Sequence, residues 1–271
     1  MMSAEHVALV EGILQSAWPA LGSEMVDGWL VRTSKGYTKR ANSVTPLYQG
    51  FLGQDARIDY CESRLSANGL PSIFKLTAVH GELDIELGLR GYEKIEQSLV
   101  MALPLHEKPG GRGYLPDPDA ELHMWLTEEW LSAFCRFNKV SPNQREIAGE
   151  MLSRMPFAAA FTLLKKGRQI MAVGLAVQIL NHVVLFDIAS HPDHRREGYG
   201  RRLLTTLLAW GHGVNANAAL LQVVSTNTAA LALYKEFEFV EQYRYWYRRS
   251  DAPLKAHRAR LRSTTAKYKR D

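Results

Sequence analysis

Helical and strand-like hydrophobic patterns alternate along the chain. Residues 8–18 and 56–67 carry apolar side chains at helical spacing, three and four positions apart. Apolar and β-branched residues typical of strands occupy residues 29–31, 43–45, 72–79, 157–164, 170–177 and 182–190. Because short strands and helices are interspersed, the pattern predicts an α/β (α+β) fold, with a sheet flanked by helices.

The clearest succession of strand, turn and helix begins at His182. The unbroken apolar run 183–189 is too short for a helix and predicts a buried strand. A turn with Pro192 follows, and the next apolar side chains recur on one helical face up to Gly211 and Gly213, namely Leu203, Leu204, Leu207 and Leu208.

The turn between this strand and this helix has the residues of an anion site. Gly198 and Gly200 remove β-carbons where the first N–H groups of a helix lack partners and the helix dipole is positive. Arg195, Arg196 and Arg201 add positive charge, so a diphosphate would fit. The pattern is R-x-x-G-x-G; neither the G-x-G-x-x-G dinucleotide motif nor the P-loop motif occurs. A glycine-rich turn with solvated arginines is the alternative.

Two segments together indicate a family. IASHPDHRREGYGRRLL (188–204) resembles the acetyl-CoA signature of the GNAT superfamily of N-acetyltransferases, and NTAALALY (227–234) resembles its second signature. The resemblance covers residues 157–248, about a third of the chain. Within the superfamily, this part of the chain is similar to the enzymes that acetylate the N-terminus of a ribosomal protein. It implies the GNAT fold, a central mixed, twisted β-sheet flanked by helices.

The resemblance also implies a reaction, the direct transfer of acetyl from acetyl-CoA to a primary amine of a small molecule or protein. In that family, backbone groups corresponding to Ile188, Ala189 and Ser190 hold the pantetheine and acetyl carbonyl, and Asn227 bonds the pantetheine arm. Tyr234 would protonate the leaving thiolate as general acid; a packed helix tyrosine is the alternative. The diphosphate would bind residues 195–201, namely Arg195, Arg196, Glu197, Gly198, Tyr199, Gly200 and Arg201.

The general base departs from the family pattern. Gln222 stands where the related enzymes have a glutamate, and an amide cannot accept the proton. Asp187, His191 and Glu197 are nearby titratable candidates. The absent carboxylate leaves a second hypothesis open, a non-catalytic acyl-CoA-binding sensor or interaction module.

The N-terminal part resembles a second copy of the same unit. Residues 83–94 repeat the helix–aromatic–strand shape of residues 230–241, with Tyr92 matching Phe239 at an offset of 147. No R-x-x-G-x-G precedes it, so a degenerate GNAT-like half is expected; chance recurrence of the unit is the alternative. The proline- and glycine-rich residues 104–118 predict a linker. The expected division is therefore residues 1–103 (degenerate half), 104–118 (linker), 119–250 (catalytic domain) and 251–271 (basic tail).

Charge and cysteine content restrict the partners. The 33 basic and 28 acidic residues give a net charge of +5, and residues 251–271 alone hold seven basic and two acidic side chains. The remaining residues are formally neutral, so we expect a solvated tail rather than nucleic-acid binding. The two cysteines, Cys61 and Cys135, are expected to be reduced packing residues. The sequence has no metal-ligand spacing and no apolar run long enough to span a membrane. Its first residues do not have the pattern of an export leader, so we do not expect export. We therefore expect a cytoplasmic monomer or homodimer without a metal.

Overall fold

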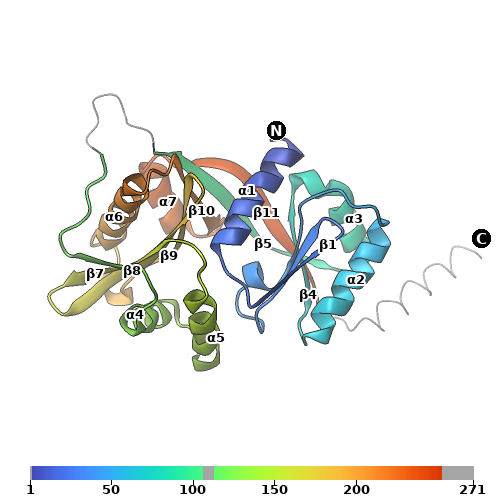
Figure 1. The fold of residues 1–271 in the computed structure, drawn as a ribbon, viewed down its shortest axis with the longest axis horizontal. Helices are drawn as coiled ribbons and strands as arrows, with labels where there is room; N and C mark the ends of the chain where they lie inside the picture. The colour runs from blue at the N-terminus through green and yellow to red at the C-terminus, as the bar shows by residue number, and fades with distance from the viewer. Residues whose placement is uncertain (1, 106–112, 252–271) are drawn as a thin grey trace, which may run out of the picture. The chain divides into compact units, whose positions relative to one another are not determined.

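The computed structural model describes residues 2–105 and 113–251, which form two compact units. The first unit comprises residues up to 11, 20–97 and 244–251, and the second comprises residues 12–19 and 98–243. Three elements run from one unit into the other, namely α1 (Ala4–Ala17), β5 (Glu93–Pro104) and β11 (Val240–Ser250) (Figure 1).

In this division residues 12–19 and 98–103, expected in the N-terminal half, fall in the second unit, and residues 244–250, expected in the catalytic domain, fall in the first. Strand β5 continues through residue 103, and its residues 98–104 pair with β10 of the second unit. Residues 245–250 of β11 pair with β4 of the first unit. Strand pairing between distant segments thus sets the units, whereas linker composition records only a local break. Residues 106–112 of the expected linker and residues 252–271 of the expected tail lie outside the described residues.

The first unit is built on a five-strand arrangement in the order β1-β2-β3-β4-β11. Neighbouring strands are antiparallel except β3 and β4, which are parallel and pair Val44 with Phe74. A parallel pair needs a crossover connection, and α2 supplies it. The elements are β1 (Gly22–Val26), β2 (Trp29–Thr33), η1 (Lys39–Ala41), β3 (Val44–Pro46), α2 (Gln54–Ala67), β4 (Ser72–Thr77), η2 (Ala78–His80) and α3 (Gly81–Leu89).

The second unit repeats this scheme with strand order β5-β10-β9-β8-β7-β6. Its parallel pair is β9 and β10, and α6 is the crossover between them. The elements are β6 (Ala120–His123), α4 (Glu128–Asn138), α5 (Pro142–Ser153), β7 (Ala159–Lys166), β8 (Gln169–Ile179), β9 (His182–Ser190), η3 (Pro192–His194), α6 (Tyr199–Gly213), β10 (Ala218–Val224) and α7 (Thr228–Glu236).

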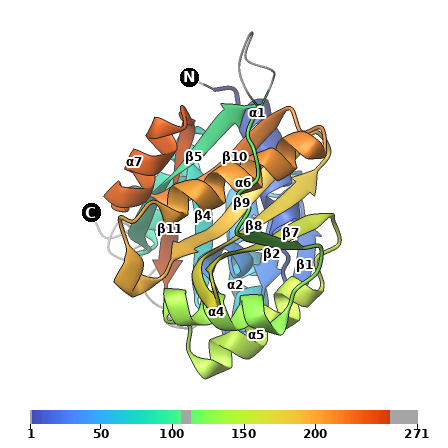
Figure 2. The same ribbon diagram turned by 90° about the vertical axis from the view of Figure 1, so that its left-hand side faces the viewer.

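Helices cover both faces of the second sheet. Ala172 and Ala176 share a buried cluster with Leu203 and Leu207 of α6, which lies across β7, β8 and β9 (Figure 2). Phe161 belongs to the opposite face, since it pairs with Leu175, and its ring meets Trp130 of α4 at 5.2 Å. The predicted strand 182–190 and the capping box of Ser141 with Gln144 are confirmed.

Backbone hydrogen bonds support the duplication. The N–H of Tyr92 donates to Leu87 O at 2.9 Å after α3, and the N–H of Phe239 donates to Tyr234 O at 3.0 Å after α7. Both pairs are related by the offset of 147 residues. The preceding residues, Gly91 and Glu238, both have left-handed backbones, with φ of 84° and 67°. Glu238 costs roughly 1 kcal/mol there because of its β-carbon, so the same helix ending recurs in both units.

The two cysteines are free and buried, as expected. Burial raises the pKa of the Cys61 thiol to about 12, so this side chain packs as an apolar group. No helix among the described residues combines the length and apolar character that crossing a bilayer requires.

Candidate active site

The parallel strands of the second unit separate partway along their length. Pairing between β9 and β10 runs from His182 with Ala218 to Leu185 with Leu221 and ends there. Strand β9 nevertheless continues to Ser190, and β10 continues to Val224. Residues 188–190 therefore keep backbone groups on the side facing β10 that do not pair with that strand. Such an opening can receive an extended ligand along β9.

A bulge lies at the point of separation. Leu175 of β8 pairs with Phe186, but Val173 pairs with Ala189, so two residues of β9 face Gly174 alone. One of them, Asp187, has a left-handed backbone with φ of 53°. Bulges bend a strand and redirect its side chains, and this one changes the course of β9 directly before the candidate acetyl-CoA residues.

The turn after β9 leads into the exposed start of α6. Arg196 and the N-cap Gly198 have left-handed φ values of 63° and 84°. The N-cap provides no side-chain hydrogen bond, so the first N–H groups of this 15-residue helix are not capped by a side chain. At Gly200 an added β-carbon would lie 3.4 Å from Ser190 Oγ. Glycine thus leaves the backbone open where β9 ends and α6 begins.

The structure separates the arginines of the motif into two groups. Arg195 and Arg196 are exposed, and neither makes an ion pair with any residue in the described part of the chain. Arg201 instead pairs with Glu236 of α7. Arg202 makes a bidentate contact with Asp117 at 2.6 and 2.8 Å. The first two remain available to an anion, and the others stabilise the helix that presents it.

Two further residues of the motif have structural partners. The Tyr199 side chain is 6 % exposed and belongs to the core cluster, so only its backbone N–H points to a ligand role. Glu197 Oε1 lies 3.0 Å from Nδ1 of His194 within the turn. These contacts shape the turn and do not extend into its opening.

Helix α7 carries the second signature. The Asn227 Oδ1 caps the helix by accepting the N–H of Ala230 at 3.2 Å, while the residue itself is exposed. Tyr234 is 8 % exposed, and its ring centroid lies 5.7 Å from that of Phe239. Tyr234 therefore belongs to the core cluster of the second unit, together with residues of β10 and α6. The Tyr234 ring is therefore packed in the core, as the alternative interpretation expects. The Tyr234 hydroxyl remains the candidate general acid.

The candidate bases occupy different environments. Gln222 is half-buried on β10 opposite Val100. The His191 ring packs edge-on against Phe137 of α4, with centroids 5.2 Å apart. Asp187 is half-buried at the bulge, close enough to α4 that its charge acts on Cys135, whose thiol pKa is raised chiefly by burial. Asp187 and His191 therefore contact or influence α4, which borders one face of the sheet.

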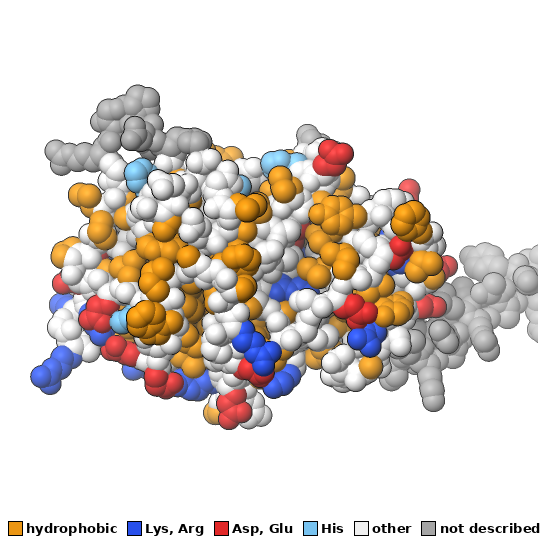
Figure 3. Space-filling model, viewed as in Figure 1, with side chains coloured by type: hydrophobic (Ala, Val, Ile, Leu, Met, Phe, Trp, Pro, Cys, Tyr) orange, Lys and Arg blue, Asp and Glu red, His pale blue; other side chains and the backbone are white. Residues whose placement is uncertain are grey.

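Surface charge shows no single-sign region on the face drawn in Figure 3. Among the described residues, Lys and Arg side chains on this face lie between Asp and Glu side chains. Ion pairs between described residues include Lys165 with Glu121 at 2.7 Å and Arg64 with Glu24 at 2.8 Å. This distribution agrees with the nearly neutral composition of the chain outside its C-terminal residues.

Comparison with known proteins assigns the family. Residues 6–248 match the family described as "Probable histone acetyltransferase Rv0428c C-terminal". The chain belongs to this family. A Bacillus subtilis member of the same class, "Uncharacterized N-acetyltransferase YobR", is 25% identical over 251 residues, which cover 90% of this chain and 98% of that one.

Two further comparisons bear on the halves of this acetyltransferase. The Escherichia coli "[Ribosomal protein bS18]-alanine N-acetyltransferase" is 35% identical over 81 residues, 30% of this chain and 54% of that enzyme. A "Tandem GNAT protein from the clavulanic acid biosynthesis pathway" superposes with a TM-score of 0.59 at 9% identity, over 92% of this chain and 96% of that one. The chain thus has the GNAT fold, and the likeness to the tandem GNAT protein extends across both units.

Proposed function

We propose that this member of the family transfers the acetyl group of acetyl-CoA directly to a primary amine, with both substrates held in one ternary complex. The separation of β9 from β10 is the observation that carries the proposal. It opens backbone groups of residues 188–190 beside an uncapped helix N-terminus. The amine belongs to a small molecule or a protein; the description of the matched family mentions a histone, and the name of one relative mentions a ribosomal protein.

The chain's own groups can hold each part of acetyl-CoA. The pantetheine arm would lie along β9 in the opening, bonded by backbone groups of Ile188, Ala189 and Ser190. The diphosphate oxygens would accept hydrogen bonds from the first N–H groups of α6, with Arg195 and Arg196 beside them. The Asn227 Oδ1 already caps α7, so its amide N–H₂ would donate to the pantetheine arm.

The transfer needs one acid and one base. The amine nitrogen attacks the acetyl carbonyl carbon, the C–S bond breaks, and the thiolate takes a proton from the Tyr234 hydroxyl. Asp187 is the base we favour, because it lies at the bulge where the strands separate. Its carboxylate is also close enough to α4 for its charge to act on Cys135. The amine proton passes to the Asp187 carboxylate directly or through one water. Glu197 is less suited because it is bonded to His194.

Titration calorimetry with acetyl-CoA tests the proposal. We expect the wild type to bind, and the double variant Arg195→Gln/Arg196→Gln to bind at least tenfold more weakly at fixed salt, since two charges beside the diphosphate are lost. Arg168→Gln, an exposed arginine in the β7–β8 hairpin, is the control and should bind as the wild type does. Absence of binding by the wild type would contradict the proposal.

A further inference from the structure

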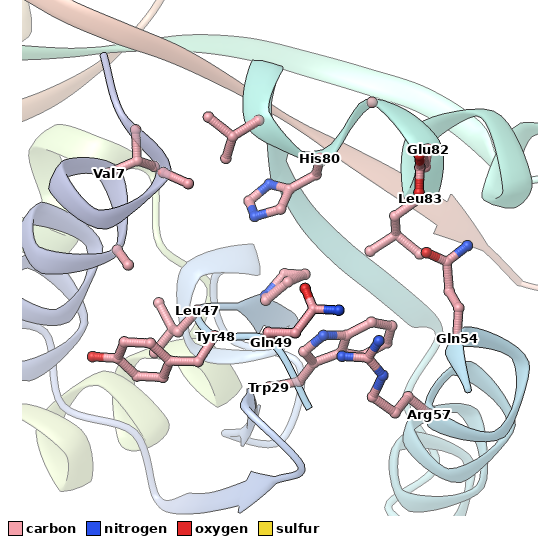
Figure 4. Close-up of a pocket in the computed structure, with 15 residues that line it drawn as sticks. Val7, Trp29, Leu47, Tyr48, Gln49, Gln54, Arg57, His80, Glu82 and Leu83 are labelled. Atoms are coloured by element: carbon pink, nitrogen blue, oxygen red, sulfur yellow. The ribbon is translucent and has the colours of Figure 1, made fainter. Parts of the chain in front are cut away.

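A cavity of about 430 Å³ lies in the first unit, and no residue of the candidate active site lines it. Its walls come from α1, β2, the segment after β3, and the N-terminal ends of α2 and α3 (Figure 4). The volume falls within the range of small-molecule pockets. All of its lining residues belong to the first unit, so the cavity does not depend on the acetyltransferase proposal.

A buried arginine lines this cavity. Arg57 of α2 is 8 % exposed, and its guanidinium lies over the Trp29 ring, 4.7 Å from the centroid (Figure 4). Its closest acidic atom is Asp27 Oδ2, 3.8 Å from Nε, too far for a hydrogen bond. Nε has no hydrogen-bond partner in the described part of the chain. Arg57 is thus compensated by the more distant Asp27 charge and by the Trp29 ring, and its guanidinium can still donate hydrogen bonds to an anion in the cavity.

Two helices begin at the same cavity and add to its positive potential. Helix α2 starts at Gln54 and α3 starts at Gly81, and neither N-cap side chain makes a capping hydrogen bond. The N-terminal ends of both helices therefore favour an anion. The neighbouring His80 ring accepts the Thr77 N–H at 3.0 Å, and burial lowers its pKa, so it stays neutral. The lining carboxylate, Glu82, is exposed.

In the first unit, a carboxylate of the chain itself occupies the turn that corresponds to the candidate diphosphate turn. Residues 47–53 connect β3 to α2, as the candidate diphosphate turn connects β9 to α6. In this segment the Asp27 carboxylate accepts the N–H groups of Phe51 and Leu52 at 2.8 and 2.9 Å, which lower its pKa. A β-carbon at Gly50 would overlap that carboxylate. The counterpart of the diphosphate turn is thus filled by the chain's own anion, which excludes a CoA ester bound in the same way.

We propose that the cavity binds a small carboxylate, held by the Arg57 guanidinium and with its apolar part against Leu47 and Leu83. The fork of guanidinium N–H groups matches the two oxygens of a carboxylate, and stacking on Trp29 already orients it. The apolar walls favour an organic acid over inorganic phosphate. Gln49 and Gln54 add amide groups at the same cavity.

Calorimetric titration of the full chain with hexanoate, benzoate and inorganic phosphate tests this site. The variants are Arg57→Gln, Gln54→Glu and the control Arg64→Gln, each of which lowers the net charge by one. Arg64 lies on the same helix but is exposed and paired with Glu24. Gln54→Glu places a negative charge at the cavity while favouring the first turn of α2, so it keeps the fold even if Arg57→Gln does not.

We expect at least one of the two carboxylates to bind the wild type and Arg64→Gln with a stoichiometry of one. Its affinity should fall at least tenfold in Gln54→Glu, and in Arg57→Gln if that variant is folded by circular dichroism. No binding of either carboxylate by the wild type would overturn the proposal. Equal binding by Gln54→Glu, or tighter binding of phosphate than of both carboxylates, would also overturn it.

Discussion

Replacing Glu11 by alanine tests how far the first unit depends on one buried ion pair. The two oxygens of Glu11 lie 2.8 and 2.6 Å from Nζ of Lys75, and these side chains are 2 % and 1 % exposed. The ammonium also lies 4.1 Å from the centroid of the Tyr245 ring. The substitution would remove the carboxylate and leave the lysine charge in a site from which water is excluded.

The expected loss is about 3–5 kcal/mol, the usual cost of breaking a buried pair by removing one partner. At about 2–4 °C per kcal/mol for a chain of this size, the melting temperature should fall by roughly 6–20 °C at pH 7. Burial lowers the pKa of Lys75 in the folded state, and Glu11 opposes that shift. Without Glu11 the folded pKa falls further below the unfolded value. Between those two pKa values the unfolded chain binds more protons, so the variant's stability should rise with pH.

The assay is thermal unfolding followed by circular dichroism at pH 7 and pH 9.5. Glu5→Ala, an exposed acid in the first turn of the same helix, is the control and should change stability by less than about 0.5 kcal/mol. The double variant Glu11→Leu/Lys75→Met should recover most of the loss, because apolar residues of similar size can replace a buried pair. A Glu11→Ala variant as stable as Glu5→Ala would refute the reasoning.

Three further predictions concern the second unit. Tyr234→Phe should lower kcat for acetyl transfer at least tenfold, while acetyl-CoA binding measured by calorimetry persists. If the wild type transfers acetyl and the variant does so at the same rate, Tyr234 is not the acid. If the wild type transfers no acetyl, the sensor hypothesis is favoured. Asp187→Asn should lower kcat with little effect on acetyl-CoA binding, and an unchanged kcat would point to another base. Arg202→Gln should cost about 1–2 kcal/mol in thermal unfolding at pH 7 because it removes the bidentate contact to Asp117. Arg202 lowers the pKa of Asp117, so its stabilisation holds above the unfolded pKa and is lost as pH falls below it; the wild type and variant should converge toward pH 2, and a constant difference would contradict the assignment.

Local sequence patterns predicted the elements that depend on neighbouring residues. The strand 182–190 has the predicted bounds because an unbroken apolar run between turn residues leaves few other local structures. The capping box at Ser141 followed from three side chains within four positions. Strands β1 and β6 were not predicted. Both are short, and each contains only half-buried and exposed residues, so neither has a buried apolar run to mark it.

The partners of the charged side chains were beyond sequence reasoning. All seven residues from Arg195 to Arg201 were assigned to acetyl-CoA by the motif, but Tyr199 faces the core and Glu197 bonds His194. Arg201 pairs with Glu236 across two helices. A motif specifies the local backbone conformation and which of its residues are charged. Which charges remain unpaired depends on segments that pack beside it, and those are distant in the sequence.

The sequence by itself determined the strand–turn–helix frame of the candidate site, the helix endings that recur at an offset of 147 residues, and the family. Each rests on residues close in the chain, where backbone geometry and hydrophobic spacing are encoded directly. The tertiary structure alone decided the division into units, the Glu11–Lys75 pair 64 residues apart, and the Asp27 carboxylate 24 residues from the N–H group it accepts. It also decided that Arg57 lies buried at a cavity, with no hydrogen-bond acceptor for its Nε among the described residues. These features depend on the order of the strands and on which distant side chains are buried against one another. Neither can be read from a local sequence pattern.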